Sequence, residues 1–278
     1  MDSALDLLPS DLFAGRTVFV TGGGSGINFG IAQGFAHLGA DLALCGRSAE
    51  RLDAARRALV ATSANVHTVA ADVRDASALA TAMEGAVDRL GRLDVLVCGA
   101  AGNFPAAAER ISPNGFRSVV DIDLNGTFHA CHAAFPALQA SGGSIIAISA
   151  HQAQVPYAGQ AHVCAAKAGV DQLVRTLALE WGRHGIRANA VAPGPVNGTE
   201  GVRRLLPGDH AERARKLVPL GRLAETSDIA AACVFLASPL AAFINGVVLD
   251  VDGGGGLGGS GPWNALVACA MQGNSDGD

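Results

Sequence analysis

The stretch Thr21-Gly22-Gly23-Gly24-Ser25-Gly26-Ile27-Asn28 decides the fold class. It follows the apolar run Thr17–Val20, which predicts a buried strand, and it precedes a helical pattern of apolar residues at Ile31, Phe35 and Leu38. Glycines in this position permit a tight turn, after which the amides at the helix N-terminus can face a pyrophosphate. The alternative is a set of glycines needed only for the turn. The candidate dinucleotide-binding residues are Gly22, Gly23, Gly24, Ser25, Gly26 and Ile27.

Strands and helices alternate along the rest of the chain. Such alternation predicts right-handed crossovers and a parallel sheet covered by helices on both faces. The 278 residues, of which 49% are hydrophobic, suffice for one large core. We therefore expect one α/β domain, a Rossmann-type doubly wound parallel sheet of seven strands. The six further strands are predicted at Leu42–Cys45, Val66–Ala70, Val95–Cys98, Ser144–Ser149, Arg187–Ala192 and Val247–Asp250.

The domain is expected to have short additions. Residues 1–14 are predicted to be an N-terminal extension, residues 15–254 the domain, and residues 255–278 a glycine-rich tail. The polar, Arg-rich segment 199–217 follows a Pro/Gly turn and is predicted to be a small lid after the sixth strand. Residues 253–259 are expected to form no regular element because six of these seven residues are glycine.

Composition excludes several classes of function. The formal charge is −5 and no basic run is present, which argues against nucleic acid as a partner. No apolar run has the length of a membrane span, so we expect no membrane contact and a cytoplasmic location. The six cysteines show no CxxC pair, which is typical of reduced thiols. His129, Cys131 and His132 share one helical stretch without a second ligand pair, so no metal is expected.

The residues after the second and third strands predict the cofactor. Gly46-Arg47-Ser48 offers a cation and a hydroxyl where an NAD enzyme places a carboxylate for the ribose, which favours NADP(H). An ordinary solvated arginine at the start of a helix is the alternative for Arg47. Asp72 and Val73 are placed to meet the adenine.

Over Arg16–Gly254 the chain resembles the short-chain dehydrogenase/reductase family. The likeness rests on Thr21–Ile27, Cys98–Gly102, Lys167, Pro193-Gly194 and Asp252-Gly253-Gly254. Within that family it is most similar to the 2,4-dienoyl-CoA reductases, especially the peroxisomal type. That closer likeness is carried by Ala100–Phe104, Asp121-Ile122-Asp123, Ala192–Pro195, Gly198–Gly201 and Arg203-Arg204. The resemblance implies a homotetramer acting on an acyl-CoA.

The catalytic residues of the family are only partly present. Lys167 is one of two lysines in the chain, but Val163 stands at the tyrosine position and Ala150 at the serine position. The longer tyrosine-to-lysine spacing of many enoyl-thioester reductases falls on Gln160, and Asp123 replaces the active-site asparagine. A solvated helix lysine, and a helix carboxylate paired with Arg117, are the alternative interpretations of Lys167 and Asp123. His151, His162 and Tyr157 are candidate substitute acids that are more often lining or packing residues.

These absences disfavour ketone reduction, because an alkoxide needs a proton from an acidic hydroxyl. The resemblance implies that hydride from NADPH attacks the far end of a 2,4-diene and that the α carbon is then protonated, which leaves a 3-enoyl-CoA. Lys167 would hold the nicotinamide ribose and provide positive potential near the thioester oxygen. Asp123 would orient or protonate a catalytic water. A reductase for another enoyl or oxoacyl thioester, and a catalytically silent NADP-binding protein, remain the alternatives.

The resemblance also implies the remaining ligand contacts. Coenzyme A carries phosphates that need cations, and three arginines match family positions that contact it: Arg47, Arg74 and Arg204. The acyl and pantetheine path is matched by Phe104, Ser112, Pro113 and Asn114. The nicotinamide side of the cofactor site is matched by Ala100, Ala101, Pro193, Gly194, Val196 and Thr199. Two departures from the family pattern are Asn28, in place of the third glycine of the turn, and Gly99.

Overall fold

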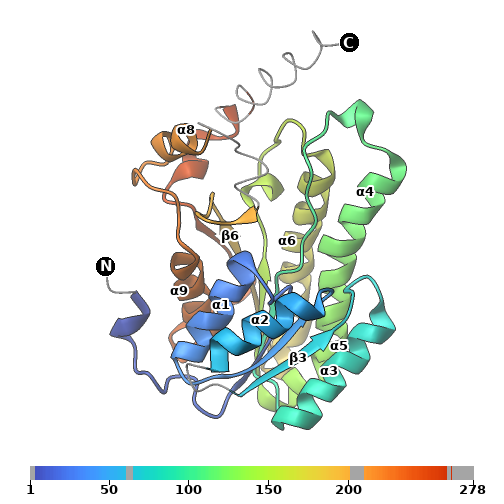
Figure 1. Cartoon of the computed structure of the whole chain (residues 1–278), viewed down its shortest axis with the longest axis vertical. Helices are drawn as coiled ribbons and strands as arrows, with labels where there is room; N and C mark the ends of the chain where they lie inside the picture. Colours follow the sequence, from blue (N-terminus) through green and yellow to red (C-terminus); the bar gives the residue numbers. More distant parts are fainter. Residues whose placement is uncertain (1–3, 61–64, 201–209, 262–263, 265–278) are drawn as a thin grey trace.

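A seven-stranded parallel sheet with helices on both faces forms the body of the computed structural model (Figure 1). The structure describes residues 4–60, 65–200, 210–261 and 264. Each predicted strand is present, with ends that differ by at most one residue. The strands are β1 (Thr17–Thr21), β2 (Asp41–Gly46), β3 (Val66–Ala70), β4 (Val95–Cys98), β5 (Ser144–Ile148), β6 (Arg187–Pro193) and β7 (Val248–Val251).

The helices connect successive strands. They are α1 (Gly26–His37), α2 (Ala49–Val60), α3 (Ala76–Leu90), α4 (Pro113–Val120), α5 (Gly126–Ser141), α6 (Ala161–Trp181), α8 (His210–Leu217) and α9 (Thr226–Ala237). A π turn, η3 (Asp121–Asn125), joins α4 to α5. Short 3-10 turns are η1 (Ala4–Leu7), η2 (Ala108–Arg110), η4 (His151–Ala153), η5 (Gly182–His184), η6 (Pro239–Ala241) and η7 (Gly255–Gly258).

The strand order is β3-β2-β1-β4-β5-β6-β7, which confirms the doubly wound parallel sheet. The chain runs outward from β1 to β3 and then returns to start β4 on the other side of β1. The direction of winding therefore reverses between β1 and β4. In open α/β sheets a ligand binds outside the carboxyl ends of the strands at such a point.

Two hydrophobic cores lie on opposite faces of the sheet, because successive side chains of a strand point in opposite directions. Val18 and Val20 of β1 pack with α1, α2 and α9. Phe19, between them, packs on the other face with α3, α5 and α6. All three side chains are fully buried, and each contributes about 1.5–3 kcal/mol to the stability of the fold.

The described part of the predicted N-terminal extension packs onto the domain. Leu5 and Phe13 are buried in the core on the α1 and α9 side. The Phe13 ring meets the Phe35 ring edge-on at 4.9 Å, and the Phe13 N–H donates to the Leu38 carbonyl at 2.8 Å. Residues 4–14 thus cover the C-terminal end of α1.

The glycine-rich region after β7 contains a regular turn, contrary to expectation. The Asp252 carboxylate accepts hydrogen bonds from the N–H groups of Gly254 at 2.9 Å and Gly256 at 2.6 Å, and these bonds fold residues 255–258 into η7. The sequence prediction was wrong here because it weighed glycine content and not the aspartate that precedes the run. In the predicted lid, Thr199, Glu200 and α8 are described, and residues 201–209 lie outside the described residues.

Candidate active site

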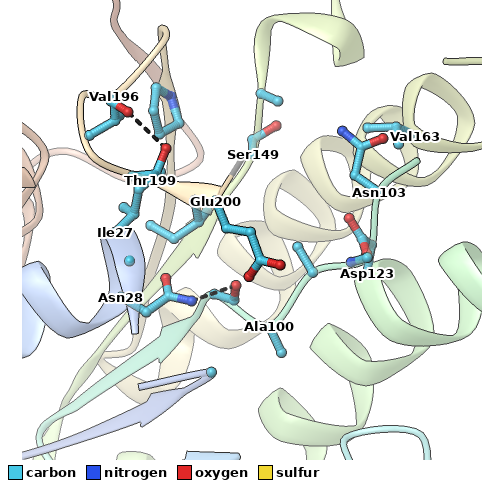
Figure 2. Close-up of a pocket in the computed structure, with 18 of the residues that line it drawn as sticks. Ile27, Asn28, Ala100, Asn103, Asp123, Ser149, Val163, Val196, Thr199 and Glu200 are labelled. Atoms are coloured by element: carbon cyan, nitrogen blue, oxygen red, sulfur yellow. Dashed lines mark hydrogen bonds between the residues drawn. The ribbon is translucent and has the colours of Figure 1, made fainter. Parts of the chain in front are cut away.

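A cleft of about 1180 Å³ opens at the carboxyl ends of the strands. It exceeds the roughly 300–1,000 Å³ of ordinary small-molecule pockets and so has room for two ligands. Its walls come from the turn after β1, the segments after β2, β3, β4, β5 and β6, the start of α6, α8, and the turn after β7. Figure 2 shows side chains from several of these segments, among them Ile27, Asp123 and Thr199, around one space.

The glycine turn after β1 has the geometry of an anion site. Gly22 has a φ of +71°, and a Cβ added to it would lie 3.1 Å from the Ala100 Cα. The backbones at Gly22 and Ala100 therefore lie close together, and a side chain at residue 22 would collide with the backbone of Ala100. Among the described residues, the Ser25 side chain makes no capping bond to α1, so the first amides of the helix face the cleft. Gly23 lies outside the described lining, and its N–H donates to the Cys45 carbonyl at 3.2 Å.

The two departures noted in the sequence, Asn28 and Gly99, lie against each other. Asn28 Nδ2 donates to the Gly99 carbonyl at 2.7 Å (Figure 2). A Cβ on residue 99 would lie 2.0 Å from Asn28 Oδ1, far inside contact distance. The amide thus replaces a glycine in the turn, and a glycine after β4 makes room for it. Asn28 ties the cofactor turn to the loop that follows β4.

The residues after β2 and β3 line the far end of the cleft as predicted for Arg47, Ser48, Asp72 and Val73. Arg51, which the sequence reasoning missed, lines the same end and lies 3.9 Å from the Glu200 carboxylate. Its spacing of four residues from Arg47 at a helix start was the available signal. This end of the cleft therefore carries two cations.

Arg74, a predicted CoA-binding residue, is paired locally. Its Nη2 lies 2.6 Å from Asp72 Oδ2, and its Nε lies 3.1 Å from both carboxylate oxygens. This hydrogen bonding lowers the pKa of Asp72, with a further contribution from the charge of Arg47. Arg74 lies outside the cleft lining that the described residues form. Its guanidinium group therefore binds the Asp72 carboxylate and does not face the cleft directly.

Asp123 and Lys167 form a buried ion pair at the centre of the cleft. Lys167 Nζ lies 3.2 Å from Asp123 Oδ2, and the two side chains are 8% and 1% exposed. Nζ also donates to the Ile148 carbonyl at 2.8 Å, and the Gly102 N–H donates to Asp123 Oδ1 at 2.7 Å. A π turn inserted in a helix often marks a functional site, and here it carries Asp123 toward Lys167. Neither residue is the solvated surface charge of the alternative interpretation.

The positions where the sequence lacks tyrosine and serine face this pair. Val163 and Ala150 line the cleft, so its wall is apolar at both positions. The neighbouring Ser149 hydroxyl donates to the buried Asp171 carboxylate. Burial raises the pKa of Asp171, while the bond from Ser149 opposes the shift. Ser149 is therefore engaged away from the family's usual role.

Tyr157, the single tyrosine of the chain, lines the cleft beside His151. Its hydroxyl lies 2.9 Å from His151 Nδ1. Burial raises the pKa of Tyr157, with added repulsion from Asp252 and Cys164. A catalytic tyrosine that protonates an alkoxide needs the opposite shift. Tyr157 therefore lines the cleft, and its raised pKa does not favour the role of a substitute acid.

Comparisons with known proteins agree with this geometry. A family model described as enoyl-(acyl carrier protein) reductase matches residues 22–255. The chain is 42% identical over 254 residues to the peroxisomal 2,4-dienoyl-CoA reductase, (3E)-enoyl-CoA-producing, of Arabidopsis thaliana, covering 88% of this chain and 85% of that protein. It is also 42% identical over 243 residues to the probable 2,4-dienoyl-CoA reductase, (2E)-enoyl-CoA-producing, of Bacillus subtilis, covering 86% and 96%. A crystal structure of a short chain dehydrogenase from Bacillus anthracis superposes with a TM-score of 0.79 at 39% identity, covering 87% of this chain and 96% of that one.

The chain belongs to the short-chain dehydrogenase/reductase family. Members of this family use a nicotinamide dinucleotide, and the chain is an oxidoreductase of that family. The glycine turn, the free amides of α1 and the close approach of Gly22 to Ala100 fit such a cofactor.

In this short-chain dehydrogenase/reductase, the residues predicted for the nicotinamide side all line the cleft. The residues that line the cleft there are Ala100, Ala101, Pro193, Gly194, Val196 and Thr199. Thr199 Oγ1 donates to the Val196 carbonyl at 2.8 Å, which closes the turn after β6 (Figure 2). A Cβ on Gly194 would lie 2.8 Å from the Asp252 Cα, so this turn packs directly on the end of β7.

The predicted acyl-path residues lie around the start of α4. Phe104 meets the His162 ring at 4.3 Å, and its ring tip would lie 3.1 Å from a Cβ on Gly115, near the start of α4. Ser112 caps α4 by accepting from the Gly115 N–H at 3.0 Å. Phe104, Ser112, Pro113 and Asn114 lie outside the described lining itself, and Arg204 lies outside the described residues.

The sequence reasoning missed several lining residues besides Arg51. Asp252 and the glycines of η7 reach the cleft from the end of β7, beside His151. The closing Asp252-Gly253-Gly254 triplet was the available signal, since a carboxylate before glycines can organise a turn.

The described residues hold neither a metal-binding cluster nor a membrane-spanning helix. No group of three or more His, Cys, Asp and Glu side chains there is placed to hold a metal ion. No helix within the described ranges is both long enough and apolar enough to cross a bilayer.

Proposed function

We propose that the protein catalyses the NADPH-dependent reduction of 2,4-dienoyl-CoA to 3-enoyl-CoA in fatty-acid β-oxidation. The observation that carries this proposal is the buried Asp123–Lys167 pair in a cleft with Val163 and Ala150 where a carbonyl reductase has its hydroxyls. The names of the relatives, 42% identical over most of both chains, support it.

The missing hydroxyls separate the two classes of reduction. Reduction of a ketone places a proton on oxygen, which requires a nearby acid of lowered pKa. Reduction of a conjugated thioester places the last proton on carbon, for which a water held by Asp123 is sufficient. The cleft suits the second reaction, since Ser149 is engaged by Asp171 and burial raises the pKa of Tyr157.

Each member of the ion pair has a distinct role. NADPH, when bound, supplies the hydride. Lys167 binds the nicotinamide ribose and places a positive charge near the thioester oxygen, where negative charge develops. Asp123 accepts from the Gly102 N–H through one oxygen, which leaves its second oxygen for Lys167 and a water. The ion pair thus positions both the cofactor and the water that supplies the proton.

Arg47 and Arg51 support a preference for NADPH over NADH. Both lie at the end of β2, where the adenosine ribose of a dinucleotide is expected, and two guanidinium groups there match a 2′-phosphate. Arg47 is also a candidate contact of the CoA phosphates, as the sequence analysis expects for Arg47, Arg74 and Arg204.

The assembly and location of the protein are part of the same proposal. Apolar side chains on α4 and α5, Phe116 and Phe128, are 39% and 47% exposed, and they support assembly into a homotetramer. A cytoplasmic location remains a prediction from the sequence.

A reductase for another enoyl thioester is the second candidate, favoured by the description of the matching family model. NADPH oxidation is measured with a trans-2,trans-4-dienoyl-CoA, a 2-enoyl-CoA and a 3-oxoacyl-CoA. Turnover of the diene alone is expected. Turnover of another thioester selects the second candidate, and tight NADPH binding without any turnover selects a silent NADP-binding protein.

A further inference from the structure

A group of buried polar atoms lies beside the catalytic pair and has no role in the account above. Asn103 Oδ1 and both side-chain heteroatoms of Gln160 make no hydrogen bond to any described residue, and the ring nitrogens of His162 make none of normal geometry. Gln160 and His162 are fully buried. We call Asn103, Gln160 and His162 the polar island. Buried polar groups without partners are rare because each loses its bonds to water on folding.

The polar island adjoins Asp123. Asn103 directly follows Gly102, whose N–H binds the Asp123 carboxylate, and Figure 2 shows the Asn103 side chain between Asp123 and Val163. His162 precedes Val163 at the start of α6, and the charge of Asp123 acts on its ring. Asp123 Oδ2, paired with Lys167, makes no hydrogen bond of normal geometry to a described residue. The island and this oxygen form one polar region.

The mixture of donors and acceptors in the island suits water. A neutral imidazole has one donor and one acceptor, the Gln160 amide has both, and Asn103 Oδ1 and Asp123 Oδ2 only accept. Burial lowers the pKa of His162, which favours the neutral ring, against weaker opposing contributions from long hydrogen bonds to the Gln160 and Phe104 backbone carbonyls and from the charge of Asp123. A water molecule can satisfy such a set because it both donates and accepts.

The proposed reaction needs a path for protons to this place. Hydride forms a C–H bond at the far end of the diene, the π electrons shift to give a dienolate, and the α carbon then takes a proton. If water gives that proton, the hydroxide left behind must be protonated from solvent before the next turnover. As whole residues Asp123 and Lys167 are 1% and 6% exposed, and cofactor and substrate would cover the cleft that both line, so neither meets solvent during the reaction.

We propose that Asn103, Gln160 and His162 enclose buried water beside Asp123, and that His162 relays through this water the proton consumed in each reduction. One ring nitrogen gives its proton to the hydroxide while the other takes a proton from the solvent side, so the imidazole is regenerated and one solvent proton is consumed. Phe104 packs edge-on against the ring and is itself 36% exposed, so the solvent side of His162 is the side that Phe104 covers. The relay rests on the proposed function, whereas the buried water does not.

Two variants of the island and one control test the relay. Gln160→Met removes two polar atoms at nearly constant volume, and His162→Gln keeps polar atoms but cannot relay through a ring. His184→Gln, beyond the C-terminal end of α6 and paired with Gln139, is the control. The readouts are NADPH affinity, thermal midpoint, kcat with the dienoyl-CoA, the solvent isotope effect in D2O and the isotope effect with deuterated NADPH.

Both island variants are expected to bind NADPH as the wild type does and to lose roughly 10²-fold in kcat, the lower end of general acid–base effects. Their solvent isotope effect rises and their NADPH isotope effect falls, because proton delivery becomes rate-limiting. Gln160→Met keeps or raises the thermal midpoint, since unpartnered polar atoms are removed. Wild-type kcat in both variants, or a loss of kcat with both isotope effects unchanged, overturns the relay.

A crystal structure of the unliganded wild-type protein provides a test that does not depend on activity. An ordered water within hydrogen-bonding distance of His162 and Gln160 is expected. A dry island overturns the proposal whatever the variants do. If the wild type reduces no dienoyl-CoA but the water is present, the proposed function has failed and the water site has not.

Discussion

Asn28 Nδ2 donates a hydrogen bond to the Gly99 carbonyl at 2.7 Å, and a Cβ on residue 99 would lie 2.0 Å from Asn28 Oδ1. The two positions are therefore coupled sterically. Gly99→Ala is expected to destabilise the protein by about 1–3 kcal/mol, the cost of overpacking, and to weaken NADPH binding. Urea denaturation and cofactor titration measure both effects. The double variant Asn28→Gly with Gly99→Ala should recover most of the loss, and strictly additive losses would contradict the coupling.

The Asp123–Lys167 pair predicts that a second substitution restores the stability lost in the first variant but does not restore its activity. Lys167→Met leaves a buried carboxylate unpaired and should cost about 3–5 kcal/mol. Adding Asp123→Asn removes that charge while keeping an oxygen for the Gly102 N–H, so stability should return toward the wild-type value. Activity should stay at least roughly 10²-fold below wild type in both variants. A double variant that regains turnover would show that the pair is structural.

Arg47 is expected to determine the choice of cofactor. Arg47→Ala should weaken NADPH binding by about 1.5–3 kcal/mol, the value of a hydrogen bond to a charged group, and leave NADH binding unchanged. Arg57→Ala, on the helix α2 that follows Arg47 and paired with Asp53, is the matched control. Equal losses for the two cofactors would remove Arg47 from the 2′-phosphate site.

Asp228 predicts a pH-dependent contribution to stability. Hydrogen bonding from Arg222 and the Glu225 N–H lowers the pKa of Asp228 below its ordinary value of 3.8. The folded state therefore binds this proton less tightly than the unfolded chain, so the contribution is complete above the ordinary value and is lost as pH falls through the lowered one. Asp228→Asn should cost about 1 kcal/mol at pH 7, and the difference from wild type should shrink in acid. A constant difference from pH 7 into the acid range would contradict this assignment.

Sequence reasoning predicted the elements well where one residue pattern carried them. Apolar runs gave all seven strands, and the glycine turn located the cofactor end because its neighbours in sequence are its neighbours in space. Lys167 and Asp123 were named from a resemblance, and their contact lies across 44 positions of the chain, beyond the reach of local patterns.

Most missed features depend on contacts between distant segments, although Arg51 lies only four residues from Arg47. Gly99, after β4, makes room for Asn28 of α1, and Asp252 reaches the cleft from the end of β7. The polar island joins the loop after β4 to the start of α6. Sequence reasoning considered His162 as a substitute acid but favoured a lining or packing role, because nothing near it in the chain shows that its ring nitrogens lack hydrogen bonds of normal geometry.

Product analysis tests the central claim most directly. The protein is incubated with a trans-2,trans-4-dienoyl-CoA and NADPH in D2O, and the product is examined by mass spectrometry and NMR. Our account predicts one NADPH consumed per 3-enoyl-CoA formed, with solvent deuterium at the α carbon and hydride from the cofactor at the far end of the former diene. A 2-enoyl-CoA product, deuterium elsewhere in the chain, or no consumption of NADPH would contradict it.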